Sequence, residues 1–258
     1  MGPVRFLELV GTVVTTLLEA LGRFVLLLSQ TLRGLVRPPF DLRALVSQVV
    51  RVGVDSVPVV LVTAGFTGGV LALQTFNGFA RFHAEGFVGS VVALSMLREL
   101  GPVLTGLMVT GRAGSAMAAE LGTMRVTEQI DALVALATDP VQYLFVPRFV
   151  AGILVLPMLV VLSNGVGIVG GYVVAVRLLG ANPVVYVDNT FQYLGMEDLW
   201  SGLIKAAVFG GLLTFIGCQR VFDTTGGAEG VGRATTAAVV SGSLAILVAD
   251  FFLTKVLF

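Results

Sequence analysis

An adjacent pair of opposite charges, Arg98 and Glu99, stands in the middle of a long apolar stretch. Residues 86–97 and 100–111 are uncharged, so a single helix through both ranges places the pair near the centre of a lipid bilayer. Charge at that depth is costly, and it is kept where it has a partner or a function. The pair is therefore the first candidate for chemistry in this chain.

Two more charges, Lys205 and Asp250, lie inside other apolar runs. Neighbouring residues on a helix do not face each other, so Arg98 and Glu99 need different partners. Lys205 and Asp250 are the candidates for these partners. Two interpretations remain open: a charge-neutral network that holds three helices together, or the polar floor or gate of a substrate cavity.

Catalytic patterns do not explain these charges. The chain has one histidine and one cysteine, so we expect neither a metal site nor an intrachain disulfide. Glycines within residues 227–233 have the spacing of a phosphate loop, but the lysine and the adjacent serine or threonine are missing. No HExxH or paired-carboxylate pattern indicates hydrolysis. We therefore expect no catalytic residue, metal ligand or cofactor in this chain.

Composition sets the class of protein. Hydrophobic residues make up 56% of the chain and charged residues 12%, with a mean hydropathy of +0.95, which no ordinary soluble domain of this length shows. The net charge is zero, which argues against a nucleic-acid partner. The amino terminus lacks the pattern of a removable signal peptide. We expect an all-α integral membrane protein with one transmembrane domain over residues 1–258.

Five apolar runs are long enough to cross a bilayer. They cover residues 56–80, 86–111, 149–176, 199–219 and 234–253. A polar loop is expected over residues 177–198, and a glycine-rich turn is expected to begin at Asp223. Most arginines then fall on the side of the amino terminus, which predicts a cytoplasmic amino terminus and a periplasmic carboxyl terminus.

The segment before these runs, residues 4–37, has a different pattern. On a helical wheel its charged and amide side chains fall within an arc of roughly 80°, and its other faces are mostly apolar. A narrow charged stripe along the whole length predicts an interfacial helix in the headgroup region. The alternative is a spanning helix whose stripe contacts other helices.

Residues 112–148, between the second and third runs, are too polar to lie in lipid. Thr127 fits an N-cap, and Glu128 and Asp131 follow in the first turn, so we expect a helix to start there. The Asp-Pro pair at 139–140 ends that helix and allows another to begin. The prediction is an amphipathic helix of about ten residues. A plain connecting loop is the alternative, although linkers between antiparallel helices are usually shorter.

Three stretches resemble a known family. They are LSMLRELGPVLTGLMVTGRAGSAMAAELGTMRVTEQIDAL from Leu94, DPVQYLFVPRFVAG from Asp139, and GVGRATTAAVV from Gly230. They closely resemble the MlaE/YrbE permeases, the membrane subunits of ABC transporters that move lipids together with MCE proteins. The resemblance runs from about residue 40 to the carboxyl terminus and is most specific over residues 94–152.

The resemblance implies an interfacial amino-terminal helix, five transmembrane helices and a cytoplasmic coupling helix in the region 120–137. It implies that two copies pair in the bacterial inner membrane and that each contacts a separate ABC ATPase, which binds ATP and Mg. The candidates for the ATPase contact are Glu120, Arg125, Glu128 and Asp131. Other implied partners are an MCE-domain protein, a small STAS-like cytoplasmic subunit and membrane lipids.

The resemblance also implies a lipid cavity between the two copies, lined largely by the first spanning helix. The matching positions are Leu71, Gly78, Phe79 and Phe82, although the glycine offers no side chain for a contact. The charges in the apolar runs also match charged positions of the family. They complete the expected substrate-binding set with Arg98, Glu99, Lys205 and Asp250.

The function implied by the resemblance is ATP-driven transport of lipid, with phospholipid as the expected cargo, for outer-membrane lipid asymmetry or lipid trafficking. Two other classes remain open. A secondary transporter would use Glu99, Lys205 and Asp250 as a proton relay, and a structural scaffold would support an MCE assembly without moving lipid. The long segment 112–148 argues against both classes, because neither needs an extended docking surface.

Overall fold

The computed structural model describes residues 3–35, 41–220 and 224–257, and within these ranges it contains helices and no strand. Five helical segments are long and apolar enough to cross a membrane. Their bounds are Leu42–Phe82, Glu85–Val126, Val141–Leu178, Met196–Gln219 and Gly227–Leu257. The all-α fold and the five spans agree with the prediction, so the chain is a multi-pass membrane protein.

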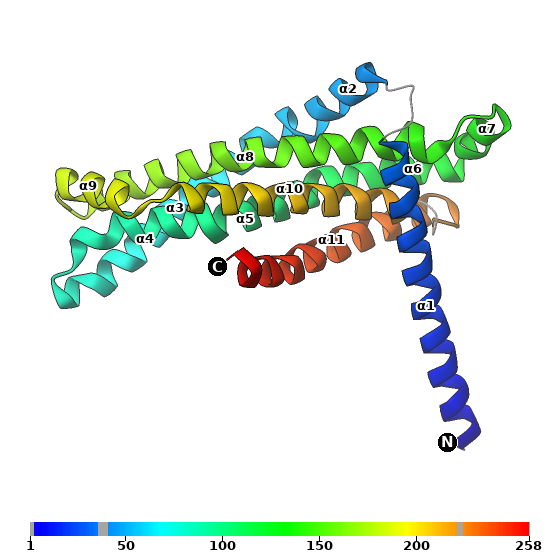
Figure 1. The fold of residues 1–258 in the computed structure, drawn as a ribbon, viewed down its shortest axis with the longest axis horizontal. Coiled ribbons are helices and arrows are strands. Elements are labelled where there is room, and N and C mark those ends of the chain that lie inside the picture. The colour runs from blue at the N-terminus through cyan, green and yellow to red at the C-terminus, as the bar shows by residue number, and fades with distance from the viewer. Residues whose placement is uncertain (1–2, 36–40, 221–223, 258) are drawn as a thin grey trace.

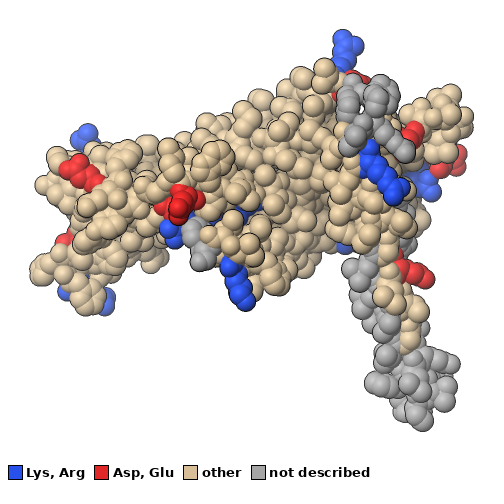
Figure 2. Space-filling model, in the orientation of Figure 1, with Lys and Arg blue, Asp and Glu red and all other residues tan. Residues whose placement is uncertain are grey.

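The spans run along the long axis of the molecule (Figure 1), with helix α7 at one end and helix α9 at the other. We call these the α7 end and the α9 end. On the face drawn in Figure 2, most of the lateral surface consists of uncharged side chains, as expected for contact with lipid. The distribution of arginines predicts that the α7 end is cytoplasmic.

Helix α1, Pro3–Gly34, runs across the long axis and meets the bundle near its own carboxyl end (Figure 1). The rings of Phe24 and Phe215 pack edge to face there, with 4.9 Å between their centroids. If the spans stand upright in the membrane, a helix across them lies in the membrane plane, so this arrangement favours the interfacial interpretation over a spanning helix. Arg37, the last residue of the predicted interfacial segment, lies outside the described residues.

The first span is bent. It consists of α2, Leu42–Val52, a short 3₁₀ turn η1, Val54–Ser56, and α3, Val57–Phe79. Gly53 lies at the bend, where a Cβ atom would come within 2.8 Å of a methyl group of Val155. Glycine is therefore required for the close contact between this bend and the third span.

The second span is one long helix with two wider, π-helical turns. Its parts are α4, Val88–Ser95; η4, Met96–Leu100; α5, Gly101–Val109; η5, Thr110–Gly114; and α6, Ser115–Val126. We expected the membrane helix to give way to a surface element at Gly111, and this expectation was wrong. The helix continues because Met117, Ala118 and Leu121 are buried inside the protein.

The predicted amphipathic helix exists as α7, Gln129–Ala135, but it is shorter than expected. Thr127 is not its N-cap, because the Thr127 hydroxyl donates to the carbonyl of Thr123 at 2.8 Å and closes α6. Glu128 precedes α7 in a left-handed conformation, with φ 60°. The following π-helical turn η6, Val141–Phe145, begins after Pro140, as the sequence predicted.

The third span is at the centre of the bundle. It consists of α8, Val146–Tyr172, and the π-helical turn η7, Val173–Leu178. A Cβ at Gly68 of α3 would lie 1.9 Å from the carbonyl oxygen of Gly167, and one at Gly152 would lie 2.4 Å from that of Gly210. These glycines let α3, α8 and the fourth span approach backbone to backbone, which is how helices associate in lipid.

Two helices replace segments that we expected to be irregular. Helix α9, Pro183–Tyr193, lies inside the predicted loop, and the Asn182 side chain caps it by accepting from the N–H groups of Val184 and Val185. Tyr186 of α9 is buried, which raises its pKa to about 12 and keeps it neutral. Helix α11, Gly227–Leu257, includes most of the predicted glycine-rich turn.

Candidate functional site

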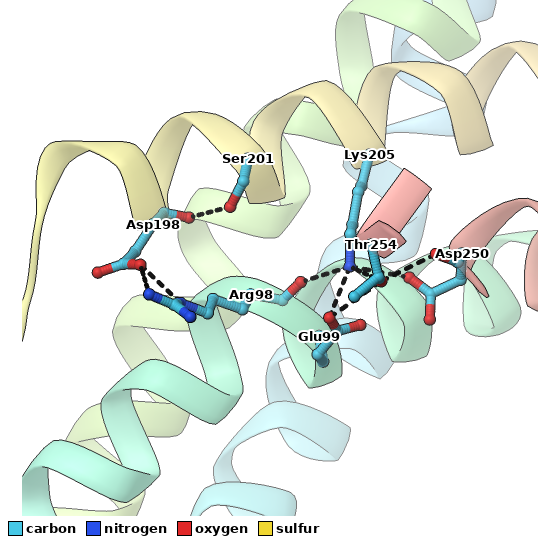
Figure 3. A network of polar contacts seen from close by, with 7 residues as sticks. All are labelled: Arg98, Glu99, Asp198, Ser201, Lys205, Asp250 and Thr254. Carbon is cyan, nitrogen blue, oxygen red and sulfur yellow. Dashed lines mark hydrogen bonds and ion pairs between the residues drawn. The ribbon is translucent and has the colours of Figure 1, made fainter. Parts of the chain in front are cut away.

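The charges singled out in the sequence lie together in one network of polar contacts (Figure 3). Lys205 comes from α10, Met196–Gln219, and its Nζ lies 2.8 Å from Glu99 Oε1 of η4. The same nitrogen lies 3.1 Å from Asp250 Oδ1 of α11. The structure thus joins three spans through one lysine. It confirms Lys205 as a partner of Glu99, but Asp250, the other expected partner of the Arg98–Glu99 pair, contacts Lys205 instead.

Lys205 also contacts the main chain of the second span. Its Nζ donates to the carbonyl oxygen of Arg98 at 3.0 Å. In a regular helix this carbonyl would accept from the N–H group four residues later, but residue 102 is a proline and has none. The ammonium group thus donates to a carbonyl whose usual donor in an α-helix, the N–H four residues later, is absent. This contact helps to compensate for the burial of Lys205, which has no exposed surface.

Arg98 has a partner that the sequence did not suggest. Its Nε lies 2.6 Å and its Nη2 2.5 Å from Oδ1 of Asp198, which is buried in the first turn of α10. The other carboxylate oxygen of Asp198 accepts from the N–H of Gly195 at 2.8 Å. We had placed Asp198 in a loop, so it was missed. The available signal was an acidic residue just before an apolar run, the position of a helix first turn.

Thr254 completes the network and was also missed. Its Oγ1 lies 2.7 Å from Lys205 Nζ, 3.1 Å from Glu99 Oε1 and 2.9 Å from the Asp250 carbonyl oxygen. Thr254 follows Asp250 by four residues, so both lie on the same face of α11. That spacing of two polar residues in an apolar run was the signal that could have identified it.

The side chains of the network differ in exposure. Lys205 is fully buried, whereas the Arg98 and Glu99 side chains are 41% and 38% exposed. These exposed charges belong to the middle part of a membrane span, where contact with lipid tails is unfavourable. A patch of this kind must face another protein surface or a polar cavity. Its guanidinium and carboxylate groups are chemically complementary to the phosphate and ammonium groups of a zwitterionic headgroup.

The predicted cavity positions on the first span have mixed environments. Leu71 and Phe79 are half-buried and pack against a core cluster that includes Val92 and Met96. Phe82 is exposed beyond the end of α3, and nothing lies within 4 Å of a Cβ built at Gly78. The exposed apolar stripe of α3 is a different set, which the sequence did not single out: Val62, Phe66, Val70 and Leu73.

The predicted ATPase-contact residues divide into two groups. Arg125 of α6 and Asp131 of α7 form an ion pair at 2.6 Å across the turn that contains Glu128, and all three are accessible at the α7 end. Glu120 instead pairs with arginines of two other segments, at 3.0 Å and 3.2 Å. The α6–α7 turn therefore presents a charged surface, whereas Glu120 connects α6 to α2 and α8.

Sequence comparison identifies similar proteins in bacteria and in a plant. The family described as Permease MlaE matches residues 45–256. A probable ABC transporter permease protein of Rickettsia typhi is 45% identical, with 97% of both chains covered. The intermembrane phospholipid transport system permease protein MlaE of Haemophilus influenzae is 39% identical, with 99% of this chain and 98% of its own covered. The chloroplastic protein TRIGALACTOSYLDIACYLGLYCEROL 1 of Arabidopsis thaliana is 40% identical, with 84% of this chain and 62% of its own covered.

Proposed function

Because the chain belongs to the MlaE permease family, we propose that it is the membrane subunit of an ATP-driven transporter that moves phospholipid together with an MCE-domain protein. The relative from Haemophilus influenzae is named for intermembrane phospholipid transport, which supports this cargo. In this proposal the chain acts in the bacterial inner membrane, with its amino terminus in the cytoplasm and its carboxyl terminus in the periplasm. Its task is lipid trafficking or the maintenance of outer-membrane lipid asymmetry.

The observation that carries the proposal is the half-exposed charge network in the middle of the spans. Arg98 and Glu99 would meet a lipid headgroup, while apolar side chains of the first span would meet its tails. We propose that two copies of the chain face each other, so that this patch lies against a shared cavity and not against lipid. Leu71, Phe79 and Phe82 then line the cavity, together with Lys205 and Asp250 behind the open charges.

Energy would enter at the α7 end. In the proposal a separate ABC ATPase binds ATP and Mg and docks on the surface formed by Arg125, Glu128 and Asp131. Glu120 would hold α6, which carries Arg125, against the first and third spans. ATP-driven closure of two ATPase subunits would displace α7, and the two permeases would shift to release or capture a lipid at the α9 end. The MCE protein would stand there, and a small STAS-like subunit would complete the cytoplasmic side.

The test uses the complex purified from its own membranes and reconstituted into liposomes with fluorescently labelled phosphatidylethanolamine. We expect ATP-dependent transfer of the label by the wild type and loss of most of that transfer in Glu99→Gln, which keeps the side-chain shape and removes the charge. Glu197→Gln is the matched control, because Glu197 is exposed near the same end of the bundle. Transfer driven by a pH gradient without the ATPase, or none at all, would contradict the proposal.

A further inference from the structure

A second set of charges, at the α7 end, joins three segments that are distant in the sequence. Glu120 of α6 is at its centre and uses both carboxylate oxygens. Oε1 lies 3.0 Å from Nη1 of Arg51, near the end of α2, and Oε2 lies 3.2 Å from Nη2 of Arg148, near the start of α8. One carboxylate therefore connects the second span to the first and to the third.

The two ion pairs of Glu120 differ in burial. The side chain of Arg148 is only 5% exposed, and its Nη1 also donates to the carbonyl of Leu144 at 2.7 Å. A buried charge of this kind needs its partner for the protein to fold. Arg51 is 58% exposed, so its side chain would be well solvated without Glu120. The Arg148 pair is therefore a structural contact, whereas the Arg51 pair is a link that folding does not require.

A second set of contacts also connects the second span to the first span. Arg112, in the π-helical turn η5, donates from Nε to Ser56 Oγ at 2.8 Å. Its Nη2 donates to the carbonyl oxygens of Arg51 and, at 3.3 Å, Val52. These carbonyls end α2 and have no partner within that helix. The Arg112 side chain thus holds the bend between α2 and α3 in two ways. It contacts main-chain carbonyls at the end of α2 and the Ser56 side chain at the end of η1.

From this arrangement we propose that Arg51 is a positioning residue of the transport cycle, which passes the motion of α6 to the first span through its ion pair with Glu120. The inference rests on the proposed function. A displacement of α7 moves α6, because the Arg125–Asp131 pair closes the turn between them. The Arg51 link then moves the end of α2, and the bend at Gly53 and η1 converts this movement into a shift of α3, which carries the expected cavity positions.

The experiment compares Arg51→Gln with wild type in the reconstituted complex, and measures ATP hydrolysis and transfer of labelled phosphatidylethanolamine separately. We expect unchanged hydrolysis and a fall of about two- to fivefold in lipid transferred per ATP, the size expected for one partly exposed ion pair. Arg51→Lys keeps the charge and should restore most of the transfer. Arg43→Gln is the matched control, since Arg43 is an exposed arginine on the same helix.

Equal transfer per ATP in wild type and Arg51→Gln would overturn the inference and leave the proposed function standing. The inference would also be overturned if hydrolysis, transfer and the amount of assembled complex fell in parallel, because the pair would then serve only stability. A wild-type complex that hydrolyses ATP without moving the phospholipid would instead refute the proposed function, and the inference with it.

Discussion

Lys205 is the side chain on which the mid-membrane network depends. Its ammonium group meets a carboxylate from each of two other spans, one hydroxyl group and one main-chain carbonyl. The network contains two basic residues, Arg98 and Lys205, and three acidic residues, Glu99, Asp198 and Asp250. It therefore has one more acidic than basic side chain. Removal of the lysine leaves an excess of carboxylates next to one another.

Lys205→Met keeps most of the side-chain volume and removes the charge. We expect the free energy of unfolding to fall by about 3 kcal/mol, the low end for a broken buried pair, because Glu99 is partly exposed and solvated. The measurement is the thermal unfolding midpoint of the purified protein in detergent. Lys255→Met, an exposed lysine on α11, is the control and should leave the midpoint unchanged. Equal midpoints for all three proteins would show that the network contributes little to folding.

Asp198→Asn tests the link between Arg98 and the first turn of α10. The amide keeps a hydrogen-bonding oxygen but loses the charge that holds the guanidinium group. If Arg98 must be held in place to meet a headgroup, ATP-dependent transfer should fall by about tenfold, in line with the loss of one charge-assisted hydrogen bond. Asp188→Asn, on the exposed side of α9, is the matched control. Wild-type transfer in Asp198→Asn would remove Arg98 from the set of positioned groups.

Among the elements, α8 depends most on glycine. We compare the same change at two sites of its neighbour α3, Gly68→Ala and Gly78→Ala. The added methyl at residue 68 would lie 1.9 Å from a backbone oxygen of α8, whereas that at residue 78 has open space. Gly68→Ala should therefore destabilise the fold by about 1–3 kcal/mol or more, as overpacking does, and Gly78→Ala should be neutral. Thermal unfolding in detergent measures both, and similar midpoints would contradict this packing.

The sequence predicted the membrane-spanning helices, because the side chains that contact lipid are apolar and give a long hydropathy signal. The five spans and the contact of Glu99 with Lys205 follow from such runs and the charges inside them. Asp250, the other expected partner of the Arg98–Glu99 pair, contacts Lys205 instead. Helix α6 was missed because it packs against other helices of the protein and does not need an apolar surface toward lipid. Small residues are enough for this packing, so its hydropathy is low. Helix α9 was missed because its Asn-Pro capping signal is local and was read as part of a loop.

Contacts that depend on the exact direction in which a side chain leaves its helix could not be predicted from the sequence. The π-helical turns at 96–100 and 110–114 shift the direction of every later side chain in the second span. Which residues Arg98 and Arg112 reach therefore depends on turns that no apolar pattern reveals. The contacts of Arg98 with Asp198, of Arg112 with Ser56 and of Arg51 with Glu120 could be located only from the structure.

At the scale of the whole molecule, the crosswise position of α1 predicts its depth in the membrane. Leu18 and Leu26 are both exposed on α1 and are about 12 Å apart along its axis. Fluorescent labels on single cysteines at these positions, in a Cys218→Ala background, should be quenched to equal depth by lipid-attached quenchers. A depth difference approaching the full spacing would indicate a spanning helix instead.

The control for this measurement is another pair with the same spacing. Val240 and Val248 are exposed on α11, which spans the membrane, and their labels should differ in depth by up to the full axial distance. Equal depths in both pairs would mean that the labels report on detergent or aggregation and not on membrane position.

If α1 lies flat in the headgroup region, as we expect, it also affects the surrounding membrane. With 32 residues, the helix is about 48 Å long, and in that position it would occupy area in a single leaflet. Lipids on that side must spread to make room, whereas those opposite are undisturbed. Each molecule therefore acts as a one-sided wedge, which creates a difference in lateral pressure between the two monolayers at its own perimeter and favours local curvature there.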